Sequence, residues 1–560
     1  MSKLKPWLLC LCVCGLILLL TVVVACVVWF AGSRVACPSG EYARAAVAAD
    51  SRLCSEIGRD MLLQGGSAVD GAIAALLCTS VVNPQSMGIG GGSIVTIRDK
   101  TGKVKVYNFR ETVPQLFKTN LLNDCPTTFR LSSGSQWIGI PGELRGYEAI
   151  HNQYGRLRWS KLFEPTIKLA RDGIPMPTYL GKLLQEPIIK NRVESSSLCE
   201  VFCNKNRTVL NKGDTLKYTK LAETMETIAQ KGAESFYTGQ VGRDLIQDIK
   251  DAGGTLKMED LASYKVRVED AWTVPLGNAQ MYIPPPPAGG TLLAFILKLM
   301  EGFSLTSESL EGDHRVQTYH RFIEAMKFAN GQRRSICDPS FNKDKSAAHL
   351  MNSSFINHIR EMISSNSTHD DSYYFNIKPS SDQTGTTHVS VMDEDGLAVS
   401  ATSTINQIFG GAIYSSRTGI ILNNELSDFC GRADAVKAGE QPPSSMTPVI
   451  LESKSGRILV IGGSGGSLIT TAVALSIMNH LWLGMNLTEA ISAPIVFVDS
   501  KNNVHFEPLF DKTVIDGLKA VGHKITHWKY FFNVVNAVEK EGGCISAFSD
   551  IRKMGQSAGY

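Results

Sequence analysis

Hydroxyl side chains gather around one glycine in the stretch SDQTGTTHVSVMDEDGLAVSATSTINQ, residues 381–407. Two runs rich in Val, Ser and Thr flank the turn sequence at 393–396, which predicts a β-hairpin. Gly385 and Thr386 stand directly before the first strand, and Thr404 lies on the return strand. If the chain were cut between Gly385 and Thr386, the new α-amino group, with a pKa near ~8, could deprotonate the hydroxyl of the same residue.

Gly385 suits self-cleavage because a residue without a Cβ can adopt the strained backbone that an intramolecular N→O acyl shift requires. The alternative is that Gly-Thr-Thr simply begins a strand, and these three residues alone favour that interpretation. His388 supports a third hypothesis, an ordinary serine or threonine hydrolase with a histidine base. A hydrogen-bonded structural histidine is the more common role, and the sequence lacks the His-Glu-x-x-His, Gly-x-Ser-x-Gly and kinase motifs.

Residues elsewhere in the chain could bind the two charged ends of an amino acid. Arg110, in YNFRETVP, has a planar guanidinium that suits a bidentate contact with a carboxylate. Asn406 follows the predicted return strand. Glu425 and Asp428 lie in ILNNELSDFC, where two carboxylates could bind an ammonium group. Each of these residues is singly more often structural, so only their combination indicates a substrate site.

Two further motifs add hydroxyl groups and backbone amides. Ser444 and Ser445 lie in PPSSMTP, and Gly465 and Gly466 lie in VIGGSGGSLITT between a predicted strand and a predicted helix. There the glycine amides and the positive end of the helix would suit a developing oxyanion. The glycine-rich MGIGGGS at 87–93 instead leads into a strand without the Gly-Lys-Ser/Thr of a phosphate-binding loop, so a packing role is expected.

Both strands and helices must position these residues. Apolar residues at helical spacing predict helices, and alternating or β-branched runs predict strands. Residues 45–82 are expected to form a strand and two helices. Further helices are predicted within 142–175, 218–251, 290–302 and 468–484, and further strands at 387–392, 397–405, 419–422, 457–463 and 503–507. Helices combined with antiparallel hairpins indicate a layered α+β fold with sheets between helices.

The N-terminal segment 7–30 contains no charged residue and is long enough to cross a bilayer. A signal peptide usually has a shorter apolar run with a small-residue cleavage site. Lys3 and Lys5 precede the run, so the positive-inside rule predicts a cytoplasmic tail at 1–6 and an extracellular remainder. We therefore expect a single-pass signal anchor and a type II topology in the plasma membrane.

Cysteines and glycosylation sequons agree with an extracellular location. Four of the 13 cysteines lie in the predicted anchor and nine follow it, where an oxidising compartment would allow disulfides. Cys54 and Cys78 lie on neighbouring predicted helices, and Cys199 and Cys203 are close enough for a tight loop disulfide. No His/Cys pair at ligand spacing supports a zinc site instead. The Asn-x-Ser/Thr sequons begin at Asn206, Asn352, Asn366 and Asn486.

The overall composition excludes some classes of function. The net charge of +3 and the lack of a long basic run give no indication of nucleic-acid binding. The sequence also has no internal repeat at a solenoid period. A chain of 560 residues could hold two or three domains or one large sandwich, and no Gly/Ser-rich linker divides it.

Nine motifs occur in a fixed order from about residue 40 to the C-terminus: AAVAAD, MGIGGG, RETVP, PGELRGY, TGTTHVSV, SATSTIN, GIILNNE, SSM and GGSGGS. In this ordered set the sequence resembles the gamma-glutamyltransferases (glutathione hydrolases), which are N-terminal-nucleophile hydrolases. The resemblance implies an αββα sandwich. It also implies self-cleavage after Gly385 into a large subunit, 31–385, and a small subunit, 386–560, that together form a heterodimer.

The same resemblance assigns roles to individual residues. Thr386 would be the nucleophile, and Thr404 would hold and tune its hydroxyl. The clamp on the γ-glutamyl α-carboxylate would consist of Arg110, Ser444 and Ser445. The partners of its α-amino group would be Asn406, Glu425 and Asp428. The oxyanion hole would be formed by Gly465 and Gly466. The pairs Cys54–Cys78 and Cys199–Cys203 match disulfides of the family.

The implied activity is cleavage of the γ-glutamyl amide of glutathione and its conjugates, including leukotriene C4 to leukotriene D4. Water or an amino acid or dipeptide would accept the γ-glutamyl group, and no metal or organic cofactor is implied. The alternative is a catalytically silent surface binding protein, against which the complete set of nucleophile, clamp and oxyanion residues argues. Ile408 replaces a tyrosine of better-known members and the stretch 430–441 is shorter, so the resemblance predicts no acceptor preference.

Overall fold

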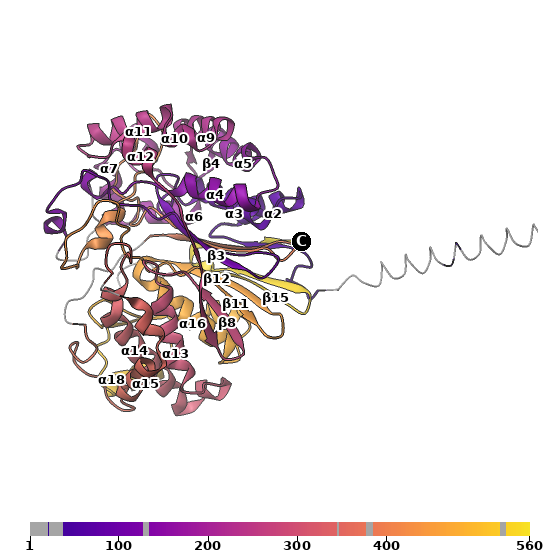
Figure 1. Cartoon of the computed structure of the whole chain (residues 1–560), viewed down its shortest axis with the longest axis vertical. Coiled ribbons are helices and arrows are strands. Elements are labelled where there is room, and N and C mark those ends of the chain that lie inside the picture. The colour runs from indigo at the N-terminus through magenta and orange to yellow at the C-terminus, as the bar shows by residue number, and fades with distance from the viewer. Residues whose placement is uncertain are drawn as a thin grey trace, which may run out of the picture.

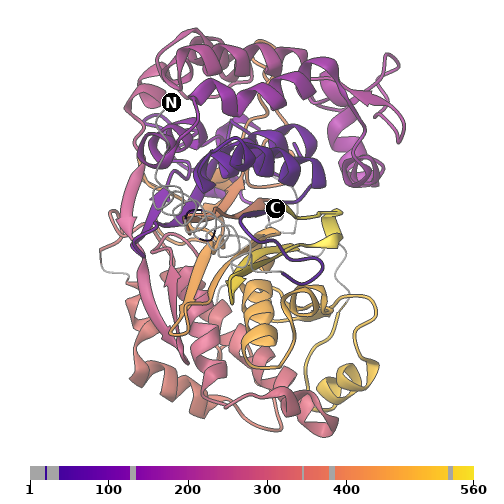
Figure 2. The same ribbon diagram turned by 90° about the vertical axis from the view of Figure 1, so that its right-hand side faces the viewer.

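The computed structural model describes residues 37–126, 134–343, 346–376, 385–526 and 534–560, together with Leu19 and Thr21. Two β-sheets face each other between two layers of helices, as Figures 1 and 2 show from two directions. This arrangement confirms the predicted layered α+β fold. The predicted anchor at 7–30 lies outside the described residues apart from Leu19 and Thr21. Within the described parts, no helix combines the length and the apolarity needed to cross a membrane.

Seven strands form the first sheet and six form the second, with neighbouring strands antiparallel. In spatial order the first sheet contains β17 (Ala558–Gly559), β1 (Ala46–Ala48), β9 (Thr387–Met392), β10 (Ala398–Thr404), β2 (Gly92–Arg98), β3 (Val104–Asn108) and β6 (Arg267–Asp270). The second contains β16 (Cys544–Ser549), β15 (Val534–Glu541), β12 (Ile458–Ser464), β11 (Val449–Ser453), β8 (Ala279–Ile283) and β7 (Trp272–Leu276). Two small sheets pair β13 (Val496–Val498) with β14 (Val504–Phe506), and β4 (Ile174–Pro175) with β5 (Thr215–Leu216).

One helical layer covers the outer face of each sheet (Figure 1). The layer on the first sheet contains α2 (Arg52–Leu63), α3 (Ala68–Val82), α4 (Glu143–Tyr154), α5 (Trp159–Asp172), α6 (Thr178–Leu184), α7 (Pro187–Glu194), α8 (Cys199–Phe202), α9 (Thr219–Lys231), α10 (Glu234–Tyr237), α11 (Gln240–Asp251) and α12 (Met258–Ser263). The layer on the second contains α13 (Gly290–Glu301), α14 (Gly312–Gln332), α15 (Ser353–Met362), α16 (Ile469–Leu481), α17 (Leu487–Ser492) and α18 (Lys512–Ala520).

The hydroxyl-rich hairpin of β9 and β10 lies at the centre of the first sheet, and every residue of both strands is buried. Val389, Val391, Val399 and Ala401 pack under α3, and Ser403 donates to Glu143 Oε1 on α4 at 2.9 Å. Two other serines of the hairpin face the second sheet. Ser390 Oγ donates to the carbonyl of Asn536 at 3.2 Å, and Ser400 Oγ donates to the carbonyl of Ile461 at 3.0 Å. These hydroxyls therefore join the two sheets, which explains why a buried hairpin contains so many of them.

Most of the predicted elements are present with shifted ends. The helical pattern at 142–175 is two helices, α4 and α5, because the chain turns at Gly155. The strand predicted at 419–422 is wrong: these residues form only an isolated bridge between Ile421 and Tyr414. Gly419 has a φ of 76°, which turns the chain there, and the segment makes loop hydrogen bonds instead of joining a sheet.

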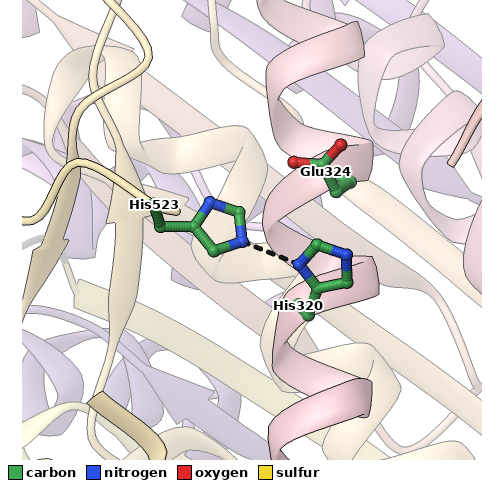
Figure 3. A group of neighbouring side chains, drawn as sticks. All are labelled: His320, Glu324 and His523. Carbon is green, nitrogen blue, oxygen red and sulfur yellow. Dashed lines mark hydrogen bonds between the residues drawn. The ribbon is translucent and has the colours of Figure 1, made fainter. Parts of the chain in front are cut away.

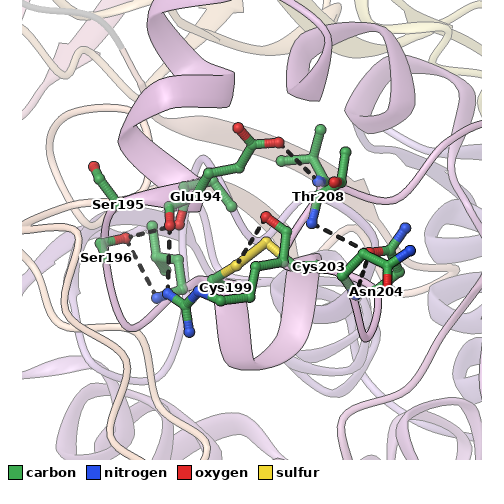
Figure 4. The surroundings of a disulfide bond; sticks show 12 residues. Glu194, Ser195, Ser196, Cys199, Cys203, Asn204 and Thr208 are labelled. Carbon is green, nitrogen blue, oxygen red and sulfur yellow. Dashed lines mark hydrogen bonds between the residues drawn. A yellow bond between two sulfur atoms is a disulfide. The ribbon is translucent and has the colours of Figure 1, made fainter.

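The described residues form four disulfides. Cys54–Cys78 joins α2 to α3, and Cys199–Cys203 closes the short turn around α8 shown in Figure 4, so both predicted pairs are confirmed. The other two, Cys37–Cys544 and Cys125–Cys430, connect residues that lie on opposite sides of Gly385 in the sequence. Cys337 takes part in none of the four and is a buried thiol.

Candidate active site

A cavity of about 90 Å³ lies beside the start of β9, where β10 and β12 end. Its walls come from segments that are far apart in the sequence, and they include nine of the ten residues predicted to act in catalysis or substrate binding. These are Arg110, Thr386, Thr404, Asn406, Glu425, Asp428, Ser444, Ser445 and Gly466. The tenth, Gly465, precedes Gly466 at the end of β12. The structure therefore brings together, in or beside one cavity, the ten catalytic and substrate-binding residues that were predicted from separate motifs.

Thr386 lies at the entry to β9, and its hydroxyl faces the end of β10. Its Oγ1 donates to Thr404 Oγ1 at 3.3 Å, and that oxygen also accepts the backbone N–H of Asn406 at 2.8 Å. Thr386 is buried and has a φ of 85°, a left-handed conformation that is strained for a β-branched residue. The predicted pairing of Thr386 with Thr404 is thus present, with backbone strain located at the same residue.

Gly465 holds the peptide group before Thr386. The N–H of Gly465 donates to the carbonyl oxygen of Gly385 at 2.9 Å. Gly465 and Gly466 have φ values of 119° and 61°, and Gly466 begins a 3₁₀ turn that leads into α16. A Cβ on Gly385 would lie 1.8 Å from the carbonyl oxygen of Asn406. Gly385 is therefore required by close packing as well as by backbone conformation.

Arg110 is buried in the wall of the same cavity and bonds to two carboxylates. Its Nη2 lies 2.6 Å from Asp428 Oδ2, and its Nη1 pairs with Glu425. Nε and Nη2 also donate to the carbonyls of Pro442 and Pro443 at 2.8 and 2.7 Å. Burial lowers the pKa of Arg110, but the two carboxylates outweigh it and raise the pKa above its ordinary value.

The two carboxylates beside Arg110 keep part of their hydrogen-bonding capacity. Burial raises the pKa of Glu425 to about 7 and also raises the pKa of Asp428. Among the residues that the structure describes, Glu425 Oε2 and Asp428 Oδ1 are buried without a hydrogen-bond partner. Asn406 instead donates its side-chain amide to Ser427 Oγ at 2.9 Å and to the carbonyl of Asn424 at 3.0 Å. The open carboxylate oxygens could accept N–H groups from an ammonium.

His388 does not serve as the base in this arrangement. It lies within β9 with both ring nitrogens engaged, Nδ1 with Thr402 Oγ1 at 2.8 Å and Nε2 with Ser390 Oγ at 2.9 Å. Full burial lowers the pKa of His388 to about 3, so the ring is neutral at neutral pH. The expectation of a structural histidine is confirmed, and the geometry opposes a hydrolase in which His388 activates Thr386.

A buried lysine beneath Thr386 was missed by the sequence analysis. Lys553 Nζ donates to the backbone carbonyl of Thr386 at 2.7 Å and to Ser464 Oγ at 2.9 Å. It also pairs with Asp50 Oδ2 at 2.8 Å, and Asp50 accepts the hydroxyl of Thr387 at 2.6 Å. No local pattern marks Lys553, although Asp50 ends the AAVAAD motif. This network fixes the backbone at the entry to β9.

Arg333 and Glu111 were also missed. Arg333 lines the same cavity and donates from Nη1 to Ser445 Oγ at 2.9 Å. Glu111 follows Arg110 in RETVP and is fully buried, and neither of its carboxylate oxygens has a hydrogen-bond partner among the described residues. Burial and the neighbouring Glu425 raise the pKa of Glu111 well above its ordinary value. The position of Glu111 directly after Arg110 in RETVP was the signal that could have identified it.

One other cluster resembles a metal site in composition. His320 and Glu324 lie on α14 and His523 follows α18, with ligand atoms within 4.8 Å of one another (Figure 3). Lys327 Nζ donates to His523 Nδ1 at 2.9 Å, so His523 Nε2–H donates to His320 Nδ1 at 2.8 Å. His320 Nε2–H then donates to the carbonyl of Ser364 at 2.7 Å. Every ring nitrogen is engaged, and the lysine ammonium opposes a metal cation at this place.

The four predicted glycosylation sequons all have exposed asparagines. Asn206 lies in the turn after Cys203, Asn366 follows α15, and Asn352 and Asn486 cap the N-termini of α15 and α17 through their side-chain oxygens. Because the caps use the oxygen, the side-chain nitrogen stays accessible in both residues. Glycosylation stays a prediction that this placement allows.

The fold and the cavity together define a class of protein. A buried threonine at the start of a central strand, within two facing sheets between helical layers, is the arrangement of an N-terminal-nucleophile hydrolase fold. The crystal structure of cephalosporin acylase from Bacillus halodurans has the same fold, with a TM-score of 0.82 and 23% sequence identity. That similarity covers 94% of this chain and 98% of the acylase chain.

The chain belongs to the gamma-glutamyltranspeptidase family, whose model matches residues 54–560. It is 46% identical over 566 residues to the glutathione hydrolase 5 proenzyme of Mus musculus, covering 98% of each chain. It is 47% identical over 552 residues to the glutathione hydrolase 5 proenzyme of Homo sapiens, covering 94% of each chain. These similarities confirm the family that the ordered motifs predicted.

Proposed function

We propose that this protein is an ectoenzyme that cleaves the γ-glutamyl amide bond of glutathione and of glutathione conjugates. The observation that carries the proposal is the single cavity that combines a strained threonine, a carboxylate-binding arginine and unsatisfied carboxylate oxygens. The names of the two glutathione hydrolase 5 proenzymes described above support glutathione as the substrate. Leukotriene C4, itself a glutathione conjugate, is proposed as a further donor.

The first reaction of the proposed enzyme is its own cleavage. Thr386 Oγ attacks the carbonyl carbon of Gly385, and the Gly385–Thr386 C–N bond breaks. The hydroxyl proton passes to the released amine, so the acyl group moves from nitrogen to oxygen. Water then hydrolyses the ester, which leaves a carboxylate on Gly385 and a free α-amine on Thr386. The hydrogen bond from Gly465 N–H to the Gly385 carbonyl and the positive φ of Thr386 support this step.

The mature enzyme would use the same threonine on its substrate. The new α-amine takes the proton of the Thr386 hydroxyl as its oxygen attacks the γ-amide carbon, and the Gly465 and Gly466 amides bind the oxyanion. The proton passes to the leaving amine, such as cysteinylglycine or its S-conjugate, and a γ-glutamyl ester remains. Water then releases glutamate, or the amine of an amino acid or dipeptide takes the γ-glutamyl group.

The charged ends of the γ-glutamyl group would bind at the far end of the cavity. Arg110 with Ser444 and Ser445 would hold the α-carboxylate. The open oxygens of Glu425 and Asp428 would accept the α-ammonium, with Asn406 nearby. Binding both charged groups would place the γ-amide beside Thr386, because the carboxylate clamp and the nucleophile line the same cavity.

Location and assembly are part of the proposal. Residues 7–30 would anchor the protein in the plasma membrane with the catalytic part outside, and exposed sequon asparagines and four disulfides support that side. Residues 31–385 and 386–560 would form the large and small subunits. Cys37–Cys544 and Cys125–Cys430 would then join these subunits covalently after cleavage.

The decisive experiment compares Thr386→Ala with Thr386→Ser in the full-length chain. The alanine variant is expected to run as one polypeptide on a reducing gel and to release no glutamate from glutathione, because it lacks the attacking oxygen. The serine variant keeps a hydroxyl and is expected to be cut and active. On a non-reducing gel, the cut wild-type protein should remain a single band because of the two disulfides. Two fragments from the alanine variant under reducing conditions would refute self-cleavage by Thr386.

Product analysis separates the enzyme from its rival, a silent binding protein of the same fold. Purified wild-type ectodomain is expected to turn over both glutathione and leukotriene C4, and N-terminal sequencing of the smaller fragment should begin at Thr386. Binding of either compound without turnover by cut protein would favour the silent protein instead.

A further inference from the structure

Arg333 bonds to two different segments that line the catalytic cavity. It follows α14 directly, and its half-buried guanidinium donates from Nη1 to Ser445 Oγ at 2.9 Å and from Nη2 to the carbonyl of Ser467 at 3.0 Å. Ser445 lines the cavity beside Arg110, whereas Ser467 directly follows Gly466. One side chain therefore touches both the predicted carboxylate clamp and the predicted oxyanion loop.

The orientation of the guanidinium is fixed from behind. Arg333 Nε donates to Asn330 Oδ1 at 3.0 Å, and Asn330 is buried and donates its own amide to the carbonyl of Asp499 at 2.8 Å. All three nitrogens of Arg333 thus have a defined partner, and the planar side chain can present its fork in one direction only.

The hydrogen bond to Ser445 determines what that serine can offer a ligand. An arginine can only donate, so Ser445 Oγ accepts the bond and keeps its single O–H for another acceptor. Donation by a cation also polarises the hydroxyl and makes it a stronger donor. Ser444 differs, because its Oγ accepts a neutral backbone N–H from Met446 at 3.1 Å. Ser445 is therefore the better prepared of the two serines to donate to a carboxylate.

The charge of Arg333 reaches the cavity in a different way from that of Arg110. Arg110 forms ion pairs with Glu425 and Asp428. Arg333 donates to the neutral oxygens of Ser445, Ser467 and Asn330. A carboxylate bound to the Ser445 hydroxyl would consequently lie one hydrogen bond away from the Arg333 guanidinium.

We propose that Arg333 is a positioning residue that makes the enzyme select donors with a free α-carboxylate. It directs and polarises the Ser445 hydroxyl, and it keeps the loop after Gly466 in register with the bound carboxylate. This inference rests on the proposed function, because it assumes that a γ-glutamyl group occupies the cavity.

The test measures kcat and KM of Arg333→Gln and Arg333→Lys with two donors, γ-glutamyl p-nitroanilide and the same compound with its α-carboxylate converted to a carboxamide. Arg333→Gln is expected to raise KM for the carboxylate donor ~10- to 100-fold, the value of a lost charge-assisted contact. The carboxamide donor should change less than about threefold, since a neutral amide oxygen is a weaker acceptor for the polarised Ser445 hydroxyl than a carboxylate is. Arg333→Lys keeps the charge but cannot hold both serines, so an intermediate loss is expected.

Two further variants complete the design. In a Ser445→Ala background, Arg333→Gln should add less than about threefold for the carboxylate donor, because the two residues act through one contact. Arg334→Gln is the matched control: it removes the adjacent, exposed arginine and should leave both donors unchanged. Equal effects of Arg333→Gln on the two donors, or additive effects with Ser445→Ala, would overturn the inference. Failure of the proposed function would look different, because wild-type protein would then turn over neither donor.

Discussion

The catalytic cavity and the histidine cluster of Figure 3 are both buried groups of titratable side chains, but they differ in hydrogen bonding. In the cluster, Glu324 accepts bonds on both carboxylate oxygens from Tyr374, and Thr368 also donates to it. In the cavity, Glu425 and Asp428 each keep one buried oxygen without a partner among the described residues. The cluster is complete in itself, whereas the cavity has capacity left for a ligand.

This difference shows which buried charges are structural. A buried polar atom without a partner costs about 1–3 kcal/mol, so its presence in a folded protein calls for an explanation. In the cavity the proposed substrate would supply an explanation, because its α-ammonium could donate to the open oxygens of Glu425 and Asp428. Histidine and glutamate at ligand distance are a weaker indication, because a lysine and a backbone carbonyl already satisfy them.

Removing the arginine of the cavity should have the largest effect. Arg110→Met leaves Glu425 and Asp428 buried without their cation, and the free energy of unfolding should fall by about 3–5 kcal/mol. Urea unfolding would measure the loss. Adding Glu425→Gln and Asp428→Asn to Arg110→Met removes the uncompensated charges and should recover part of it. A loss below about 1 kcal/mol would mean that the three residues do not form one buried ion-pair group.

Breaking the cluster should cost less and should spare activity. Lys327→Met removes the donor to His523 Nδ1, while Glu324 keeps its bonds to Tyr374 and Thr368. The free energy of unfolding is expected to fall by about 1–3 kcal/mol, with kcat/KM for a γ-glutamyl donor unchanged within about twofold. A large loss of kcat/KM in the folded variant, or stabilisation of the wild type by added Zn²⁺, would show that the cluster is a functional site.

The sequence predicted those parts of the site that lie next to a local pattern. Thr386 and Thr404 stand at the ends of two readable strands, and Gly465 and Gly466 separate a strand from a helix, so each had a recognisable setting. Lys553 and Arg333 had none, because each reaches the cavity through tertiary contacts. Lys553 is 167 residues away from Thr386, and its polar partners appear only when the two sheets are packed together.

For the fold, as for the site, local sequence patterns predicted only part of the structure. Helices and the buried hairpin followed from periodicity, but the apolar run at 419–422 had the composition of a strand and lies in a loop. A run of apolar residues indicates burial but does not specify the hydrogen-bond partners of the backbone. At Gly419 the positive φ turns the chain, so the segment forms a loop and not a strand. For the site, each residue was singly ambiguous, and only the ordered motifs of the family grouped them before the structure did.

The smallest effect concerns pH and has opposite signs in the two regions. Burial lowers the pKa of His523 to about 2, so its contribution to stability is present above the unfolded pKa of ~6.5 and is lost as pH falls below it. Burial raises the pKa of Glu425 to about 7, so its contribution is present below the unfolded pKa of ~4.5 and is lost as pH rises through 7. From pH 7 to 6, the cluster should lose stability while the cavity gains it.

The two contributions can be separated with neutral replacements. Linkage gives a loss of somewhat less than ~1 kcal/mol for His523 and a gain of roughly 1 kcal/mol for Glu425 over this single pH unit. Urea unfolding of His523→Asn at pH 7 and 6 should therefore show a more favourable change on acidification than the wild type. Glu425→Gln should show a less favourable change, because the neutral amide cannot take up the proton. These expectations require that, at neutral pH, His523 is neutral and Glu425 is close to its titration point. If both variants shifted the pH dependence in the same direction, at least one of these two protonation states would be wrong.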